Sequence, residues 1–291
     1  MKKNSKIKDY LKLVRINHYL KNVLIFLPII FSGNLFNKEK LINVIIGFII
    51  FSLISSTIYI INDIKDINND KAHFQKKNRP LASETIKIKE AIVLFFILII
   101  ASIILIYFSS LNIKALLYII IYIIINILYT FYLKNKPIVD ITVLSSLFVI
   151  RVLYGAAIIN VEVSNWLNLT IMSAAFYLAL SKRNNELKNT IKAREVLKYY
   201  SNDYLNKNMY MFLSMAIIFY SLWTIDLKSV TKSSNYLIWT VPFIMIIALK
   251  YNMNIEQNKD DNPIEIVLND KWLILLIAIY GIIIISILYI S

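Results

Sequence analysis

Long uninterrupted apolar blocks constrain the fold of this chain more than any other feature. The blocks run for about 18 to 22 residues, and a helix of about 20 apolar residues spans the hydrocarbon core of a bilayer. The strands of a β-barrel would alternate polar and apolar residues, and these blocks do not. Hydrophobic residues make up 58% of the 291 residues, whereas soluble domains average nearer half. The sequence therefore predicts an all-α integral membrane protein.

Nine apolar segments are predicted to cross the membrane as helices of one domain that covers residues 1–291. Residues 1–19 form a basic, amphipathic lead-in that is expected to lie at the interface, and they lack the apolar core and cleavage site of a signal peptide. The predicted spans cover residues 23–36 (with Tyr19 and Leu20 added), 41–61, 91–109, 113–133, 138–159, 166–180, 209–225, 236–249 and 272–290.

The Lys and Arg residues predict the orientation of these spans. With nine spans, 26 of the 32 basic residues fall on the side of the N-terminus and 5 on the other side, while Arg151 lies inside a span. The side richer in Lys and Arg is cytoplasmic in most membrane proteins. We expect a multi-pass protein of the plasma (inner) membrane, with its N-terminus and its two long charged loops in the cytoplasm and its C-terminus outside. The net charge of +14 therefore does not indicate nucleic-acid binding, because the basic residues lie in loops between spans.

The first charged loop, Asn62 to Arg79, directly follows the second predicted span. It holds Asp63, Asp66 and Asp70, whose spacings of three, four and seven residues place them on one face of a continued helix. Unpaired carboxylates in one volume repel each other, and Mg²⁺ binds a few carboxylates together with phosphate oxygens of a substrate. We predict a Mg²⁺–diphosphate site here, with Asn62 and the three Asp as metal ligands. A solvated loop would account for the lysines but not for the spacing of the acids.

Basic side chains follow these acids and are candidates for binding the rest of a phosphate-bearing ligand. In the first loop they are His73, Lys76, Lys77 and Arg79. The loop after the sixth predicted span contributes Lys182, Arg183 and Glu186, which form a second wall in this interpretation. An ordinary surface ion pair along a helix is the alternative for the second set.

Two further groups of polar residues lie within or beside the spans. Arg151 is inside the fifth span, where a charge is costly, so we expect it to face the bundle interior with Asp140 and Tyr154 on the same face. Snorkelling to the interface is the alternative. Arg15, Lys21 and Asn22 flank the first span and are candidates for binding substrate or for plain interfacial anchoring.

At this point the residues resemble a known family. The pattern N-D-x-x-D-x-x-x-D after the second span, with a second charged loop after the sixth of nine spans, is similar to the UbiA superfamily of intramembrane prenyltransferases. The continuation resembles its decaprenyl-phosphate phosphoribosyltransferase branch. The matching segments are 70–73 with Lys76, 79–82, Arg15 with 21–23, 181–186 and 263–270.

The resemblance implies a UbiA-like bundle whose active-site cavity opens on the cytoplasmic side. It implies transfer of a phosphoribosyl group from 5-phosphoribosyl-1-diphosphate to a polyprenyl phosphate, with Mg²⁺ as cofactor. Lys182 and Arg183 stand where ordinary prenyltransferases carry acids, which favours a donor with an additional phosphate or an anionic lipid acceptor.

Three alternatives remain open. One is transfer of a prenyl group from a prenyl diphosphate to an aromatic or other acceptor. The second is a transporter of small solutes with an Arg151–Asp140 pair along its pathway, although transport favours more polar residues inside several spans. The third is a membrane scaffold, which has no need of the three acids. The sequence leaves the oligomeric state open, and a homo-oligomer is compatible with it.

Overall fold

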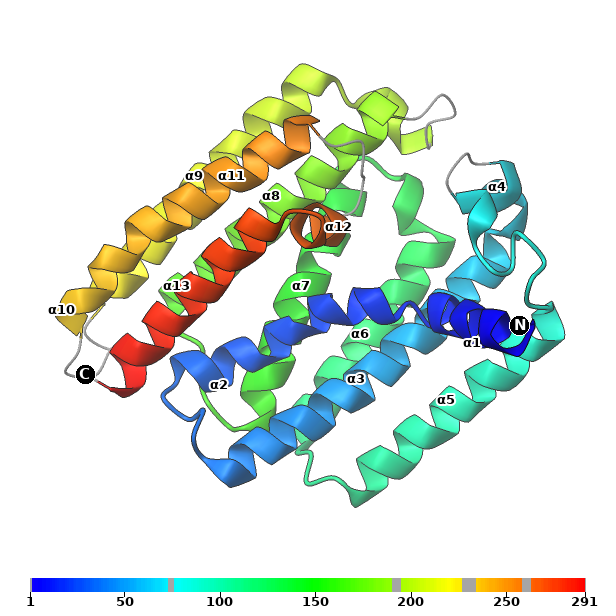
Figure 1. The fold of residues 1–291 in the computed structure, drawn as a ribbon, viewed down its shortest axis with the longest axis horizontal. Coiled ribbons are helices and arrows are strands. Elements are labelled where there is room, and N and C mark those ends of the chain that lie inside the picture. Colours follow the sequence, from blue (N-terminus) through cyan, green and yellow to red (C-terminus); the bar gives the residue numbers. More distant parts are fainter. Residues whose placement is uncertain (1, 73–75, 190–194, 227–233, 258–262, 291) are drawn as a thin grey trace.

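The computed structural model of the chain describes residues 2–72, 76–189, 195–226, 234–257 and 263–290, and within them it consists of helices joined by turns and short loops. The longer helices pack side by side around an N-terminal segment that crosses the bundle (Figure 1). In chain order the elements are α1 (Lys2–Leu13), η1 (Ile16–Phe26), α2 (Leu27–Phe31), α3 (Lys38–Lys65), α4 (Ile67–Ala72), η2 (Lys76–Asn78), α5 (Ile88–Phe108), α6 (Ile113–Phe131), η3 (Leu133–Asn135), α7 (Val139–Ile158), α8 (Asn165–Asn189), η4 (Glu195–Tyr199), α9 (Asn202–Ile225), α10 (Ser234–Leu237), η5 (Ile238–Thr240), α11 (Val241–Gln257), α12 (Pro263–Leu268) and α13 (Lys271–Tyr289).

Seven helices of the described chain are long and apolar enough to cross a membrane. They comprise α3, α5, α6, α7, α9, α13 and residues 238–257, which include η5 and α11. The N-terminal pair Lys6–Leu13 and Ile16–Phe31 makes an eighth candidate, although it is bent by 42°. Helix α8 contains the sixth predicted span, but polar side chains at both of its ends keep its apolarity low. The count of nine spans therefore stays a prediction.

Helices α3 and α7 form the centre of the bundle. In each of them 61% of the most apolar stretch is buried inside the protein, against 11% in α5 and α13, whose apolar side chains point outward. A continuous core of α3, α6 and α7 side chains, with Phe51, Tyr122 and Tyr154 at its centre, joins the three helices. Glycine at position 155 lets η1 approach α7, because a Cβ atom there would lie 2.1 Å from the carbonyl oxygen of Ile25.

The last helix closes the bundle on the first membrane segment. The Tyr289 hydroxyl, at the end of α13, donates to the carbonyl oxygen of Ile30 at 2.7 Å and accepts from the backbone N–H of Leu35 at 3.0 Å. The Tyr289 hydroxyl thus satisfies the Leu35 N–H in the turn after α2 and gives the Ile30 carbonyl a second donor besides the Gly33 N–H.

The polar elements gather on one side of the molecule. The end of α3, helix α4 and the end of α8 lie toward the upper right of Figure 1, while α10 and the C-terminus lie at the lower left. Between these ends, η1 packs against α3, α7 and α12. The two charged loops identified in the sequence are therefore brought to the same side of the bundle.

Candidate functional site

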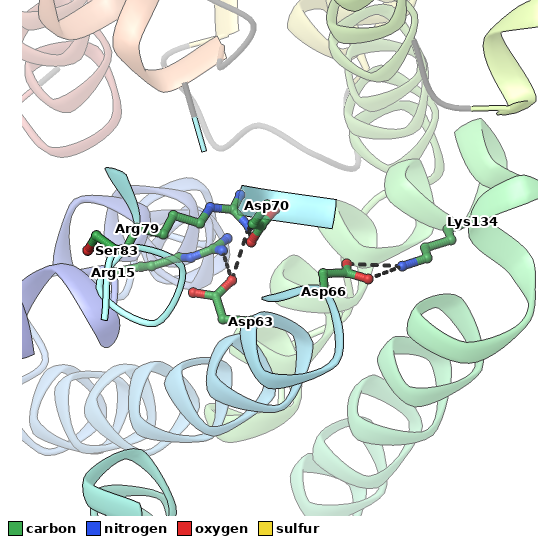
Figure 2. Close-up of polar contacts among 7 residues, drawn as sticks. All are labelled: Arg15, Asp63, Asp66, Asp70, Arg79, Ser83 and Lys134. Atoms are coloured by element: carbon green, nitrogen blue, oxygen red, sulfur yellow. Dashed lines mark hydrogen bonds and ion pairs between the residues drawn. The ribbon is translucent and has the colours of Figure 1, made fainter. Parts of the chain in front are cut away.

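Two buried carboxylates share cations at the end of α3. Asp63 lies on the last turn of α3, and its Oδ1 accepts from Arg15 Nη2 and, at 3.1 Å, from Arg79 Nη1. The same Arg79 nitrogen donates to Asp70 Oδ2 at 2.6 Å. Asp63 and Asp70 are 2% and 4% exposed, so these contacts lie inside the protein rather than on a solvated loop. Figure 2 shows both guanidinium groups directed at the Asp63 carboxylate.

The third acid of the pattern points elsewhere. Asp66 receives Lys134 Nζ at 2.8 Å and 3.0 Å on its two oxygens, on the opposite side from Asp63 (Figure 2). Helix α3 ends at Lys65, Asp66 is its C-cap, and α4 begins in a new direction at Ile67. The expectation that a continued helix brings all three carboxylates into one volume is therefore wrong. No group of three or more His, Cys, Asp or Glu side chains is arranged to hold a metal ion in the part of the chain that the structure describes.

The donor chemistry of this segment nevertheless fits Mg²⁺. Asn62, Asp63 and Asp70 offer the hard oxygen ligands that Mg²⁺ takes, and Asp66 lies at the junction between them. In the described arrangement Arg15, Arg79 and Lys134 balance the carboxylate charge. A metal ion at these oxygens would have to compete with the ion pairs.

The basic residues of the first loop surround this pair of acids only in part. Arg79 is half-buried, and burial, followed by the nearby Arg15 cation, lowers its pKa from the ordinary value while Asp63 and Asp70 oppose the change. Lys76 and Lys77 lie on η2, the first half-buried and the second exposed. The predicted ligand His73 lies outside the described residues.

The two basic residues of the second predicted wall, Arg183 and Lys182, have different surroundings. Arg183 is fully buried: its Nε donates to Asp140 Oδ2 at 2.6 Å, its Nη1 to Glu186, and its Nη2 to the Tyr129 hydroxyl at 2.9 Å. It therefore faces α6 and α7. Lys182, one position earlier on α8, is half-buried. Burial lowers the pKa of the His18 imidazole on η1, and Lys182 lies close enough for its positive charge to lower that pKa further.

A tyrosine directly after η4 completes the arrangement around Asp140. The Tyr200 hydroxyl donates to Asp140 Oδ1 at 2.7 Å and accepts from the backbone N–H of Ile138 at 2.5 Å. Burial, and then the hydrogen bond to Asp140, raises the pKa of Tyr200 above its ordinary value, so the phenol stays protonated and donates. Ile138 has a φ of 65°, which is strained for a β-branched residue, so this contact holds the start of α7 in an unusual conformation.

Arg151 does not pair with Asp140, contrary to the sequence-based expectation. Its Nε donates to Asn22 Oδ1 at 2.8 Å, and its Nη2 lies 3.3 Å from the Tyr122 hydroxyl. Asn22 in turn donates to Ser52 Oγ at 3.0 Å, which ties η1 to both α3 and α7. Tyr154 donates to the carbonyl oxygen of Gly47 at 3.2 Å and makes no hydrogen bond to Arg151 within the described residues. The prediction that Arg151 faces the bundle interior is confirmed, since it is 3% exposed.

Four polar residues of these clusters are not apparent from sequence spacing. Their signals are weak because each lies far along the chain from its partner and has an ordinary type for its position. They are Ser52, Tyr129, Lys134 and Tyr200.

Several relatives of this chain that match over most of its length are decaprenyl-phosphate phosphoribosyltransferases. This chain is 29% identical over 269 residues to decaprenyl-phosphate phosphoribosyltransferase of Corynebacterium glutamicum. The alignment covers 90% of this chain and 81% of the relative. The chain is 29% identical over 292 residues to the protein of that name in Mycolicibacterium smegmatis, covering 94% and 91% respectively.

Solved structures share the fold. The chain superimposes on a UbiA homologue from Archaeoglobus fulgidus bound to GPP and Mg²⁺ with a TM-score of 0.69, at 19% identity, over 96% of this chain and 99% of the other. A structure described as digeranylgeranylglyceryl phosphate synthase gives a TM-score of 0.63 at 21% identity, over 97% and 98%. Residues 25–188, more than half of the chain, match the UbiA prenyltransferase family. The protein therefore belongs to the UbiA prenyltransferase family.

Proposed function

We propose that this protein transfers the 5-phosphoribosyl group of 5-phosphoribosyl-1-diphosphate to a polyprenyl phosphate and releases diphosphate. The observation that carries the proposal is a gathering of cations beside two buried carboxylates: Arg15 and Arg79 converge on Asp63, and Lys182 and Lys21 lie with both of them near His18. Two phosphate-bearing substrates meet in this reaction, whereas prenyl transfer to an aromatic acceptor involves a single diphosphate. The names of the Corynebacterium and Mycolicibacterium relatives agree with it.

The acidic segment is proposed to hold the donor's diphosphate through Mg²⁺. Asn62, Asp63 and Asp70 would supply oxygen ligands, and the ion would neutralise charge on the leaving group, while Asp66 stays paired with Lys134 outside this set. Arg79, with Lys76, Lys77 and His73, contacts the diphosphate from the basic half of the loop. Asp63 and Asp70 pair with Arg15 and Arg79, and if the ion took these carboxylates, both guanidinium groups would be free to bind the phosphate oxygens.

The bond changes are simple in this mechanism. The C1–O bond to diphosphate breaks with the electron pair going to the leaving oxygen, and an oxygen of the lipid phosphate forms the new bond to C1. The attacking phosphate is already ionised, so no general base is required. Catalysis consists of positioning the two reactants and stabilising the leaving charge.

The remaining predicted residues are proposed to shape the site in different ways. Lys182 contacts phosphate directly, together with Lys21. Arg183, Glu186 and Asp140 fix the end of α8, and Arg151 with Asn22 fixes η1, so these five act through position. Tyr154 is proposed to support the same core.

We further propose that all nine predicted segments cross the plasma membrane as one domain, with the site open to the cytoplasm. Helix α8 then crosses despite its polar ends, because its neighbours α7 and α9 cover much of its surface. The polyprenyl chain lies along apolar helix faces that open to the bilayer. The proposal does not require more than one copy of the chain.

The deciding experiment is a transfer assay with purified protein. Labelled 5-phosphoribosyl-1-diphosphate, Mg²⁺ and polyprenyl phosphate should yield a labelled lipid, and EDTA should abolish the product. Asp63→Asn should remove turnover while the purified protein still unfolds in one cooperative thermal transition, since Asp70 still pairs with Arg79. A Lys8→Met variant on exposed α1 is the matched control and should keep full activity.

No labelled lipid from this donor, together with product from a prenyl diphosphate and an aromatic acceptor, would refute the proposed donor. Undiminished activity in EDTA would refute the metal dependence.

A further inference from the structure

The element η1 is an unusually long 3₁₀ helix. It runs for 11 residues, whereas 3₁₀ helices longer than three or four residues are uncommon. A 3₁₀ helix has three residues per turn, so side chains at i and i+3 lie directly above one another. The sequence of η1 is therefore sorted into three rows rather than the broader faces of an α-helix.

The three rows have different surroundings. Tyr19 and Asn22 face α3, where they contact Ser56 and Ser52 at 2.8 Å and 3.0 Å. A second row is exposed and consists of Asn17, Leu20 and Val23. The third row is half-buried and consists of His18, Lys21 and Leu24, with Arg15 directly before it at the N-cap.

The basic residues of η1 lie in the third row, which begins beside the carboxylate pair and runs into the bundle. At its start Arg15 contacts Asp63 and lies 4.7 Å from the centre of the Tyr59 ring. His18 packs edge-on against the same ring at 5.2 Å. A 3₁₀ helix rises by roughly 12 Å over six residues, so the backbone of Lys21 lies about that far from the backbone of Arg15. Lys21 is therefore deeper in the protein than the carboxylates that Arg15 contacts.

Lys21 is the residue of this row whose charge is not matched by a direct contact. Its ammonium forms no hydrogen bond or ion pair with any described residue, and Glu265 on α12 attracts it only at longer range. Arg151 and Arg15 both lie close enough to repel it. A cation in this position inside a protein is costly unless an anion accompanies it.

We infer that Lys21 is the anchor of a phosphate-monoester subsite, separate from the diphosphate site at Asp63 and Asp70. The inference rests on the proposed function, since both substrates of that reaction carry such a group: the 5-phosphate of the donor and the phosphate of the lipid. The long side chains of Arg15 and Lys21 reduce the roughly 12 Å between their backbone positions, so that one ligand or two adjacent ligands contact both. The apolar Leu24 follows Lys21 in the row, which suits a phosphate with an apolar chain behind it.

The test is a binding measurement that needs no turnover. Farnesyl phosphate and ribose 5-phosphate are titrated separately into detergent-purified protein at constant ionic strength, and affinity is measured by calorimetry. Lys21→Met should weaken binding of at least one of them by roughly ten- to a hundredfold, the size expected for losing a charged hydrogen-bonding partner. Lys21→Arg should recover most of the affinity. Loss for farnesyl phosphate alone assigns the subsite to the lipid, and loss for ribose 5-phosphate alone assigns it to the donor.

A double variant tests the row itself. Leu20→Lys with Lys21→Leu keeps composition and net charge but moves the ammonium to the exposed row. It should bind as weakly as Lys21→Met, while a Lys8→Met control binds like the wild type. Equal affinity of wild type, Lys21→Met and the double variant for both ligands would overturn the subsite, as would a wild type that binds neither ligand.

These results are independent of the transfer assay. If the transfer assay fails while Lys21→Met still loses monoester binding, the proposed reaction is wrong and the subsite stands.

Discussion

Replacing Asp140 by Asn tests whether the buried cluster around Arg183 stabilises the bundle rather than binding substrate. The exchange keeps the size of the side chain and removes its charge. In the wild type Asp140 accepts from Arg183 at 2.6 Å and from Tyr200 at 2.7 Å, and both Asp140 and Arg183 are completely buried. In the variant the guanidinium retains Glu186, and the new amide nitrogen faces one of two former donors.

The expected loss follows from burial. Removing one partner of a buried ion pair costs about 3–5 kcal/mol, because a charge is left uncompensated in a medium of low dielectric constant. Glu186 still contacts Arg183, so we expect about 3 kcal/mol, the lower end of that range. An exposed pair on the same protein provides the matched control: Asp203 and Lys207 are 2.7 Å apart with side chains 73% and 75% exposed. Asp203→Asn should cost no more than about 0.5 kcal/mol.

The assay is reversible unfolding in mixed micelles with increasing SDS, followed by the fluorescence of the four tryptophans. Arg183→Met and the double variant Asp140→Asn/Arg183→Met complete a thermodynamic cycle, and a coupling above about 1 kcal/mol is expected for residues in direct contact. If Asp140→Asn unfolds within about 0.5 kcal/mol of the Asp203→Asn control while phosphate binding is lost, the cluster is not structural and the reasoning is refuted.

Two further predictions concern packing and orientation. Gly155→Ala should displace η1 from α7 and lower the thermal unfolding midpoint, since the new methyl group meets the Ile25 carbonyl oxygen at 2.1 Å; an unchanged midpoint would show that η1 shifts freely. Because the chain contains no cysteine, single introduced cysteines can report the side of the membrane. Lys77→Cys should react with an impermeant maleimide only from the cytoplasmic face, and Phe36→Cys only from the outer face. Labelling of both from the same side would refute the nine-span orientation.

The helical fold and its centre follow from local sequence properties. Apolar blocks long enough to span a bilayer identify α3, α5, α6, α7, α9 and α13, because hydrophobicity over 20 residues does not depend on distant contacts. The bend at Arg15 is less accessible to such reasoning. Arg15 has a φ of 55°, and no glycine or asparagine marks the left-handed position.

The site was predictable in residue type and only partly in geometry. Asp63 and Asp70 meet at one guanidinium because Arg79 bridges them across the break between α3 and α4. Asp66 does not join them, because α3 ends one residue earlier and the spacing rule holds only within a continuous helix. Two buried arginines were available to pair with Asp140, and only the packing of α7 against α8 selects Arg183 over Arg151.

The contact of Tyr289 with the end of α2 has a consequence for the order of synthesis. The amide of Leu35 emerges from the ribosome some 250 residues before the hydroxyl that accepts its hydrogen bond. Unpaired backbone groups are costly within a bilayer. Until translation is complete, the first membrane segment therefore depends on water, lipid headgroups or a temporary protein partner at this end. A nascent chain stalled before the last helix should remain bound to insertion machinery or be a preferred target of membrane proteases.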